Sequence, residues 1–222
     1  MALVAIKGEP GMFWDSVTQQ KINISEWRED DKWDTTMLVN GAVALNHTLN
    51  FFRDLTNKEI LDTNFATPRK IPEGEEMRLE RIGVHIPTAL GNTVPPPADI
   101  KKVAENGYLM FQLNRKDVAE GPLVKFPSGY GLAGNTVETD AGIVTIGTPA
   151  TAAAAKLARE QLITPRSDCD GVITYHKRTW ASTDVVAAGL SAAAGGQTPT
   201  LAGDVMVRLY LHGLIRSAAT KG

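Results

Sequence analysis

The sequence contains a single cysteine, Cys169, among 222 residues. One thiol cannot form an intramolecular disulfide, and no second cysteine or histidine lies near it at the spacing of zinc ligands. This absence excludes a disulfide-stapled domain and a cysteine-based zinc site. We therefore interpret Cys169 as a small, partly buried side chain.

Long apolar runs are also missing. No segment approaches the roughly 20 apolar residues that a membrane-spanning helix requires. The short apolar run within residues 1–8 has no basic segment before it, and charges and prolines follow it closely, so we do not interpret it as a signal peptide. We expect a soluble chain, or one that belongs to an assembly, made and matured without export.

An excess of charge of either sign is absent as well. The chain has 23 basic and 25 acidic residues, which gives a formal net charge of −2. Such a balance provides no overall field that would attract nucleic acid or an anionic membrane. We therefore predict no specific nucleic-acid partner, and any contact with an anionic surface has to be local.

Catalytic and cofactor motifs are the last absence. The chain has no Walker loop, no G-x-S-x-G elbow and no activated cysteine pair. Its histidines are far apart and lack the spacing that places two imidazoles on one metal; they are His47, His85, His176 and His212. We predict no catalytic residue, no metal and no cofactor, and hence a protein that is not an enzyme.

Two short motifs resemble ligand loops without their required context. Residues 129–134 match G-x-G-x-x-G, but the residues that follow lead towards β structure, whereas a dinucleotide loop must open a helix. Residues 167–171 contain D-x-D-G, yet no acidic residue stands where a calcium loop needs its bidentate glutamate. We interpret the first as a flexible glycine loop and the second as a turn that leads into a strand.

What the sequence does contain is alternation with a period of two, the pattern of half-buried strands. It occurs in residues 79–87, 108–115 and 205–216. In the last of these, four apolar side chains are expected to face the core: Val205, Val207, Leu209 and Leu211. The residues between them, Arg208, Tyr210 and His212, are expected to face outward.

Other segments complete an all-β prediction. Further short strands are expected at residues 60–65, 122–126, 141–147 and 172–180, with a loop of small residues at 187–203. Helical spacing or composition predicts three modest inserts, at residues 41–55, 98–106 and 151–162. This count favours an antiparallel β-sandwich with a few short helical inserts over alternating βαβ units.

The N-terminal segment is rich in tryptophan. Trp14, Trp27 and Trp33 stand among charged residues, a composition that suits an arm packing on a neighbour. The alternative, that these rings cap the open end of the protein's own sandwich, is equally compatible with the pattern. We divide the chain into an N-terminal arm or extension at residues 1–35 and a single domain at residues 36–222.

Several segments in order resemble a known family. They are Asn57-Lys58-Glu59-Ile60-Leu61-Asp62-Thr63-Asn64-Phe65; Ile71-Pro72-Glu73-Gly74-Glu75-Glu76 before residues 79–86; Gly121-Pro122-Leu123 with Phe126-Pro127-Ser128-Gly129; and Leu209-Tyr210-Leu211-His212-Gly213. Together they resemble the jelly-roll capsid proteins of tailless icosahedral bacteriophages, especially those with an internal membrane. The resemblance covers residues 57–216 and lies in the general character of these segments and their order along the chain.

This resemblance implies an eight-stranded antiparallel jelly roll and a structural role in the virion, after synthesis in the host cytoplasm. The partner it implies is the chain itself, as a trimer or pseudo-hexameric capsomer, and it allows a second capsid protein and an internal viral membrane as further partners. We expect seven residues, together with the tail at 216–222, to contact neighbouring subunits. They are Trp14, Trp27, Trp33, Arg208, Tyr210, His212 and Arg216.

Other functions remain open at this point. A carbohydrate-binding β-sandwich would use exposed rings such as Tyr130, Tyr175 and Trp180 as sugar-stacking platforms. An enzyme on a jelly-roll scaffold would need a bound metal, for which the ligand pair is missing. A phage decoration or tail protein is a further possibility.

Overall fold

The structure, a computed structural model, describes residues 3–15, 19–39, 41–42, 46–87, 97–128, 136–137, 143–144, 154–175, 200–201 and 204–217. Within these residues the fold is almost entirely β, with one α-helix, α1 (Pro97–Asn106), and two short 3₁₀ helices. No helix in the described part is long and apolar enough to cross a bilayer. The prediction of an all-β, antiparallel fold is confirmed.

The first of two four-stranded sheets is built around the last strand of the chain. Its strands lie in the order β12 (Ala155–Ile163), β7 (Glu75–His85), β15 (Val205–Ser217) and β4 (Trp27–Leu38). Every pairing is antiparallel, and β15 is paired with β4 over twelve residues, from Val205 opposite Leu38 to Arg216 opposite Trp27. The C-terminal strand is therefore central, not peripheral.

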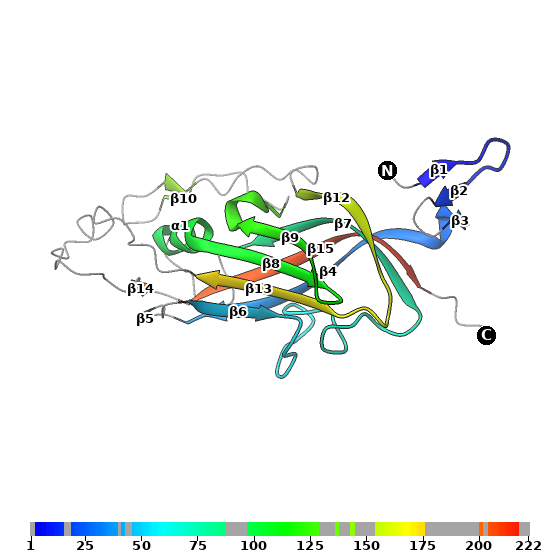
Figure 1. Cartoon of the computed structure of the whole chain (residues 1–222). Coiled ribbons are helices and arrows are strands. Elements are labelled where there is room, and N and C mark those ends of the chain that lie inside the picture. Colours follow the sequence, from blue (N-terminus) through cyan, green and yellow to red (C-terminus); the bar gives the residue numbers. More distant parts are fainter. Residues whose placement is uncertain are drawn as a thin grey trace.

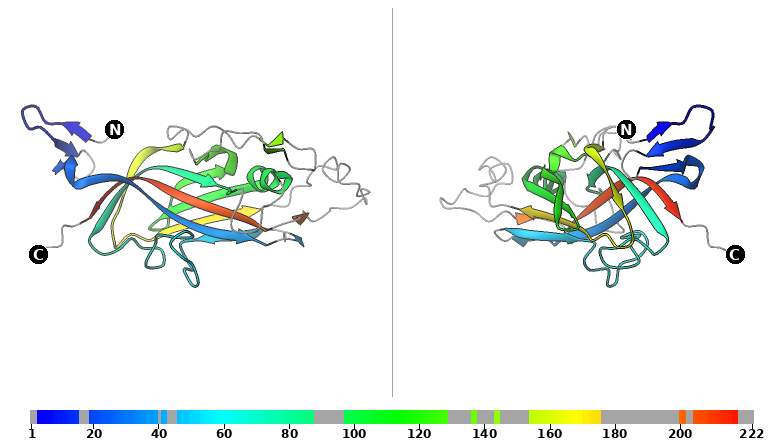
Figure 2. Two further views of the ribbon diagram at one scale, coloured as in Figure 1. Left: turned by 180° about the vertical axis from the view of Figure 1, so that it is seen from behind. Right: turned by 45° about the vertical axis from the view of Figure 1, so that its right-hand side comes forward.

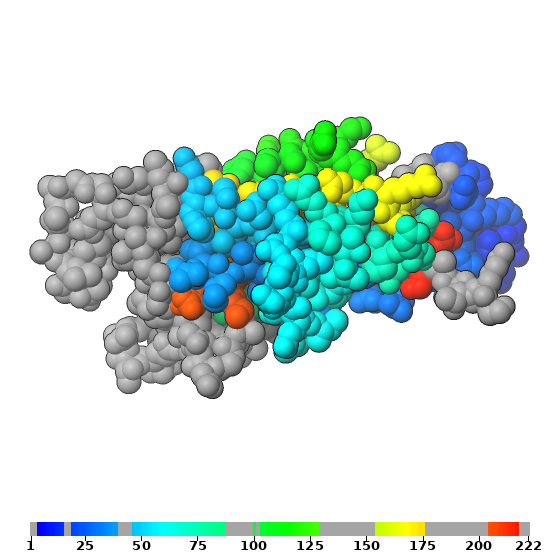
Figure 3. Space-filling view, turned by 90° about the horizontal axis from the view of Figure 1, so that it is seen from below, coloured from blue at the N-terminus to red at the C-terminus, as the bar shows by residue number. Residues whose placement is uncertain are grey.

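The second sheet contains the strands that lie between these in the sequence. Its order is β6 (His47–Phe51), β13 (Cys169–Tyr175), β8 (Gly107–Leu113) and β9 (Lys116–Pro122), again antiparallel throughout. The two sheets lie face to face, as in a β-sandwich (Figure 1). The connection between β6 and β7 runs along one side of the molecule and appears in cyan to teal in the view from below (Figure 3).

Apolar side chains of both sheets form one core. The largest fully buried ones are Phe51, Phe52, Phe111, Leu38, Met77, Leu79, Ile82, Leu109, Ile163, Ile173, Leu209 and Leu211. The two sheets pack tightly where Gly171 faces Leu209, because a Cβ at Gly171 would lie 2.5 Å from Leu209 Cδ2. Each large side chain contributes roughly 1.5–3 kcal/mol when it is buried.

The first sheet contains an irregularity beside its central strand. His212 is opposite Arg81 while Gly213 is opposite Leu79, so Glu80 is an extra residue on β7, a β-bulge. At this point a Cβ on Gly213 would lie 1.8 Å from the carbonyl oxygen of Arg78. Only glycine fits there, because the bulge brings the two backbones together.

A separate small sheet precedes the sandwich. It has the order β1 (Leu3–Ala5), β2 (Met12–Asp15) and β3 (Gln20–Asn23), followed by the 3₁₀ turn η1 (Ile24–Glu26). Three views place it at one end of the molecule, beyond the two large sheets (Figures 1 and 2). The sequence-based boundary at residue 35 falls inside β4, so residues 27–35 belong to the sandwich sheet.

The remaining elements are short. They are the 3₁₀ helix η2 (Leu123–Lys125) and two pairs of two-residue strands, β5 (Gly41–Ala42) with β14 (Thr200–Leu201), and β10 (Thr136–Val137) with β11 (Ile143–Val144). Most of the predicted strand at 141–147 and of the predicted loop at 187–203 lies outside the described residues, as does the glycine loop at 129–134.

The strongest periodic patterns predicted the structure well. Residues 97–106 form α1 and end at Gly107, where β8 begins, and Leu109, Phe111 and Leu113 face the core as expected. In β15 the expected alternation also holds, with Val205, Val207, Leu209 and Leu211 fully buried and the residues between them partly exposed. The strand predicted at 172–180 is β13 as far as Tyr175.

Two predicted helices are wrong. Residues 47–51 form strand β6, in which Leu49 and Phe51 face inward, and residues 155–163 form strand β12. The helical spacing in the first case included Phe52, whose positive φ of 64° instead ends the strand. In the second, the alanines favoured a helix locally, but pairing with β7 overrides that propensity.

Two predicted strands are also wrong. Residues 60–65 form a turn that touches β4 at one bridge, Asp34 to Thr63, and Ile60 and Leu61 are exposed. Residues 123–125 form η2, while the neighbouring strand β9 was not predicted. Its residues are mostly polar or exposed, because β9 is at the edge of its sheet, and an edge strand carries a weak alternating signal.

Candidate functional site

Six of the seven predicted contact residues lie on the outward face of the first sheet. Antiparallel register places Tyr210 opposite Trp33 and Arg216 opposite Trp27. Arg208 and His212 lie on the same face of β15 as Tyr210 and Arg216, and all four side chains point away from the core. The seventh residue, Trp14, lies apart on the N-terminal sheet.

The middle of this outward face is a row of rings and one cation. Tyr210 stacks on His212 with centroids 5.5 Å apart and planes 11° apart, and it meets Trp33 in a tilted contact at 6.4 Å. Arg208 lies 5.9 Å from the centre of the Tyr210 ring and donates a hydrogen bond to its hydroxyl at 3.3 Å. These contacts hold the side chains in fixed positions.

His212 is held between two strands. Its Nδ1 lies 2.8 Å from the Asp31 carboxylate on β4. On the other side, Gly83 of β7 leaves room for the ring: a Cβ there would be 3.0 Å from His212 Nε2 and 2.5 Å from Ser128 Cα. The Ser128 hydroxyl in turn lies 3.5 Å from His85 Nδ1. Two histidines that are far apart in the sequence therefore flank Ser128.

Beside this row the face is hollowed by a depression of about 490 Å³. Its lining includes the acidic residues Glu29, Asp30, Asp31 and Glu80 beside Arg81 and His212. Carboxylates outnumber cations here, so the depression favours a cationic group over an anionic one. Across the described residues, no group of three or more His, Cys, Asp or Glu side chains is arranged to hold a metal ion.

Trp27 is part of the protein's own structure. It is 8% exposed, and the guanidinium groups of Arg78 and Arg216 lie 5.0 and 5.3 Å from its ring centre. Arg78 also forms a buried ion pair with Asp15, which comes from the N-terminal sheet. This cluster fixes the N-terminal sheet to the sandwich, so Trp27 fits the capping alternative.

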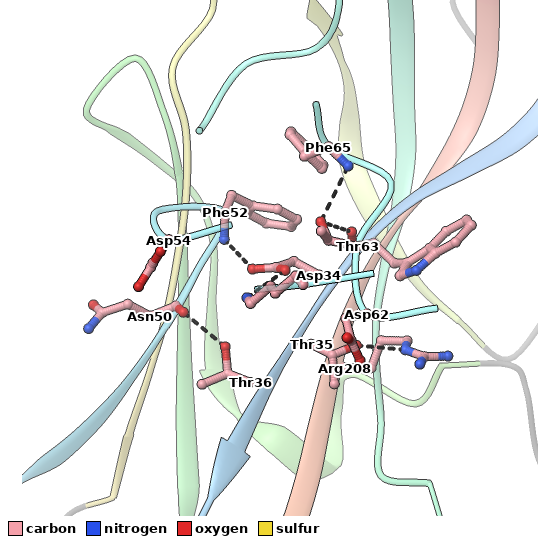
Figure 4. Close-up of polar contacts among 12 residues, drawn as sticks. Asp34, Thr35, Thr36, Asn50, Phe52, Asp54, Asp62, Thr63, Phe65 and Arg208 are labelled. Carbon is pink, nitrogen blue, oxygen red and sulfur yellow. Dashed lines mark hydrogen bonds and ion pairs between the residues drawn. The ribbon is translucent and has the colours of Figure 1, made fainter. Parts of the chain in front are cut away.

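The free edge of β4 is covered by the β6–β7 connection. Asn64 exchanges hydrogen bonds with the Trp33 backbone, its N–H donating to the Trp33 carbonyl and its Oδ1 accepting from the Trp33 N–H at 2.8 Å. Arg208 holds the same loop by donating a hydrogen bond to the Leu61 carbonyl at 2.6 Å. It also donates to Thr35 Oγ1 on β4 at 2.9 Å (Figure 4). Covering an edge in this way prevents uncontrolled strand pairing.

Trp14 is the most exposed of the three predicted contact tryptophans. Its ring is 39% exposed, and its cross-strand neighbour Val4 is 58% exposed. Both project from the same face of the N-terminal sheet, because directly paired residues share a face. Exposed apolar residues side by side on a projecting element are typical of a contact with another molecule.

Two buried side chains correct earlier interpretations. Tyr175 is 3% exposed and packs in the core, so it cannot serve as a sugar-stacking platform; burial raises its pKa well above the usual range. The other two proposed platforms, Tyr130 and Trp180, lie outside the described residues. Cys169 is fully buried, not partly, and burial, followed by the charges of Asp168 and Asp170, raises its pKa to about 12.

Sequence reasoning missed the partners of the predicted residues. Asp31, Thr35 and Asp15 were not singled out, although they hold His212, Arg208 and Arg78 respectively. Within residues 27–38, Trp27 and Trp33 lie on the outward face and Leu38 on the core face, so the apolar residues of this strand form no single alternating pattern. Only the pairing with β15 identifies residues 27–38 as a strand of the sandwich, and that pairing cannot be read from the sequence.

The comparisons with known proteins add no family to this description, since no protein-family description matches the chain and no curated protein resembles it closely enough to count as a match.

Proposed function

We propose that this chain is a structural capsid protein, an eight-stranded jelly roll that assembles with copies of itself into the capsomers of an icosahedral shell. The observation that carries the jelly-roll part of the proposal is the strand order of the two large sheets. When their eight strands are numbered one to eight along the chain, the orders are 6-3-8-1 and 2-7-4-5. Strand one thus pairs with eight, two with seven, three with six and four with five.

This nested pairing supports the jelly-roll assignment. It is what results when one long antiparallel ribbon is folded over a core, and eight-stranded double Greek keys of this kind occur in viral capsids, lectins and cupins. The fold alone therefore does not select the function. The selection rests on the projecting N-terminal sheet, whose exposed Trp14 and Val4 lie outside the sandwich and suit contact with a neighbouring subunit.

Imaging of the purified, full-length protein by electron microscopy tests the proposal directly. We expect rings, capsomers or closed particles, together with a sedimentation coefficient that increases with protein concentration. The same protein is expected in purified virus particles. A chain that stays monomeric at high concentration and is absent from particles contradicts the proposal.

One variant separates assembly from folding. Trp14→Ser removes an exposed ring, so we expect weaker assembly at an unchanged melting temperature, measured by sedimentation and circular dichroism. Val124→Ser is the matched control, because Val124 is 63% exposed on η2, away from the N-terminal sheet. If both variants assemble equally well, Trp14 does not take part in the subunit contact.

A further inference from the structure

The outer edge of the N-terminal sheet has backbone groups that no described strand pairs. β1 is the terminal strand in the order β1-β2-β3, so one of its sides faces β2 and the other is open among the described strands. An open edge is a template for another strand unless charge, proline or a covering loop blocks it. The edge of β4 is covered by a loop, whereas among the described residues no backbone hydrogen bond covers the outer edge of β1.

The hydrogen bonds define which groups point outward. The Ile6 N–H donates to the Met12 carbonyl at 3.1 Å, in register with the pairing of Val4 opposite Trp14. Because successive residues of a strand alternate in direction, Val4 directs its N–H and C=O towards β2, the side to which the Ile6 N–H also points. Leu3 and Ala5 therefore direct theirs towards the open edge.

The edge is complementary to itself. Residues 3–6 read Leu-Val-Ala-Ile, without charge or proline. If two copies are arranged antiparallel about a two-fold axis at Val4, Leu3 of each copy faces Ala5 of the other, and each pair exchanges two hydrogen bonds. The nearest cation, Lys7, lies in the turn after β1, so it is outside the residues that would pair.

The side chains fit the same arrangement. Val4 of one copy would be directly opposite Val4 of the other in a pair without mutual hydrogen bonds, where Cα atoms are about 4.5 Å apart. Trp14 flanks Val4 on the same face. The two exposed pairs would become one continuous apolar row, which removes from water the side chains that are now 58% and 39% exposed.

We propose that β1 is a two-fold contact in which the N-terminal sheets of two copies of this chain join edge to edge into one six-stranded sheet. The contact follows from the backbone directions and the neutral edge, and it goes beyond the proposed shell function because it does not depend on shell formation. In a shell it would link neighbouring capsomers.

Disulfide trapping tests this geometry. Val4→Cys places two thiols across the axis at a Cα separation that a disulfide can span, and the only native cysteine is fully buried. We expect mild oxidation of dilute, untagged protein to give a covalent dimer on non-reducing gels. The control, Val124→Cys, carries a similarly exposed thiol and should remain monomeric on the gel.

A second change tests the role of the edge. Ala5→Pro in the Val4→Cys background removes an edge N–H while leaving the β1–β2 hydrogen bonds in place. We expect cross-linking to be slower by about tenfold or more, since two symmetry-related hydrogen bonds are lost, at an unchanged melting temperature. Ala5→Ser keeps the N–H and should cross-link like the parent.

Cross-linking of Val4→Cys no faster than that of Val124→Cys would overturn the inference, as would insensitivity to Ala5→Pro. Either result leaves the capsid proposal standing if particles are still seen. Conversely, efficient trapping in a protein that never forms particles supports the two-fold contact and counts against the shell.

Discussion

The carboxylate of Asp34 accepts a hydrogen bond from the backbone N–H of Phe52 at 2.6 Å (Figure 4). Asp34 belongs to β4 in one sheet and is fully buried, while Phe52 follows β6 of the other sheet with a φ of 64°. A bulky residue rarely adopts this left-handed conformation. Asp34 therefore stabilises a strained turn that begins the β6–β7 connection.

Replacement of Asp34 should be among the most destabilising polar changes. Asp34→Ala leaves the Phe52 N–H without its acceptor. It also removes the carboxylate that lies 2.7 Å from Lys58 Nζ. Breaking a buried ion pair costs about 3–5 kcal/mol, and we expect the lower end because Lys58 is 18% exposed and can reach water. Urea unfolding measures the loss.

Two further variants separate the contribution of the charge of Asp34 to stability from that of its hydrogen bond to Phe52. Asp34→Asn keeps an acceptor for Phe52 but loses the charge, so we expect a smaller loss than for alanine. Glu59→Ala, on the exposed part of the same loop, should change the free energy of unfolding by less than about 0.5 kcal/mol. Equal losses for alanine and asparagine would mean that the ion pair, not the turn, is what Asp34 stabilises.

Two glycines at close approaches should respond differently to alanine. At Gly213 the new methyl group would meet the Arg78 carbonyl oxygen at 1.8 Å, whereas at Gly171 it would meet the Leu209 side chain at 2.5 Å. A side chain can rotate, but a paired backbone cannot. We expect Gly171→Ala to cost about 1–3 kcal/mol and Gly213→Ala to cost more or to prevent folding.

Thermal unfolding of the two variants under identical conditions checks this order. The β-bulge predicts that Gly213→Ala also disturbs the pairing of β7 with β15, which amide hydrogen exchange would detect as faster exchange in both strands. A Gly213→Ala protein as stable as the Gly171→Ala protein would show that the bulge can open without loss.

These particular residues also show what the sequence could and could not predict. Regular alternation in β8 and β15 predicted their buried faces, because the pattern itself is a consequence of burial. β4, β6 and β12 were missed or assigned as helix, since their positions depend on partners far away in the chain. The outward placement of Arg208, Tyr210 and His212 was predictable from β15 alone, whereas their contacts with Thr35, Trp33 and Asp31 required the pairing with β4.

The buried thiol of Cys169 should make stability sensitive to alkaline pH. Its pKa is raised to about 12 in the folded protein, against about 8.5 in an unfolded chain. Below pH 8.5 the thiol is protonated in both states and has no effect. Between about pH 8.5 and 12 only the unfolded chain loses the proton, so stability falls by roughly 1.4 kcal/mol per pH unit.

Cys169→Ala provides the control for this prediction. The alanine variant loses some packing at every pH, but it lacks the ionisation. Guanidinium unfolding at pH 7, 8, 9 and 10 should therefore show the wild-type advantage narrowing above pH 8.5. Parallel pH profiles for the two proteins would mean that the thiol ionises as readily in the fold as in the unfolded chain.

Tyr175 offers a test in which removal of a polar group helps. Its hydroxyl is buried, and no hydrogen-bond partner for it is found in the described structure. Burial without a partner carries a desolvation cost of about 1–3 kcal/mol, so Tyr175→Phe should raise the free energy of unfolding or leave it unchanged.

Tyr210→Phe is the matched change, because it removes the hydroxyl that accepts from Arg208. We expect it to lower stability by about 0.5–1.5 kcal/mol. Urea unfolding of both variants gives the comparison, and a Tyr175→Phe protein that is less stable than wild type would show that the hydroxyl has a partner in the native state.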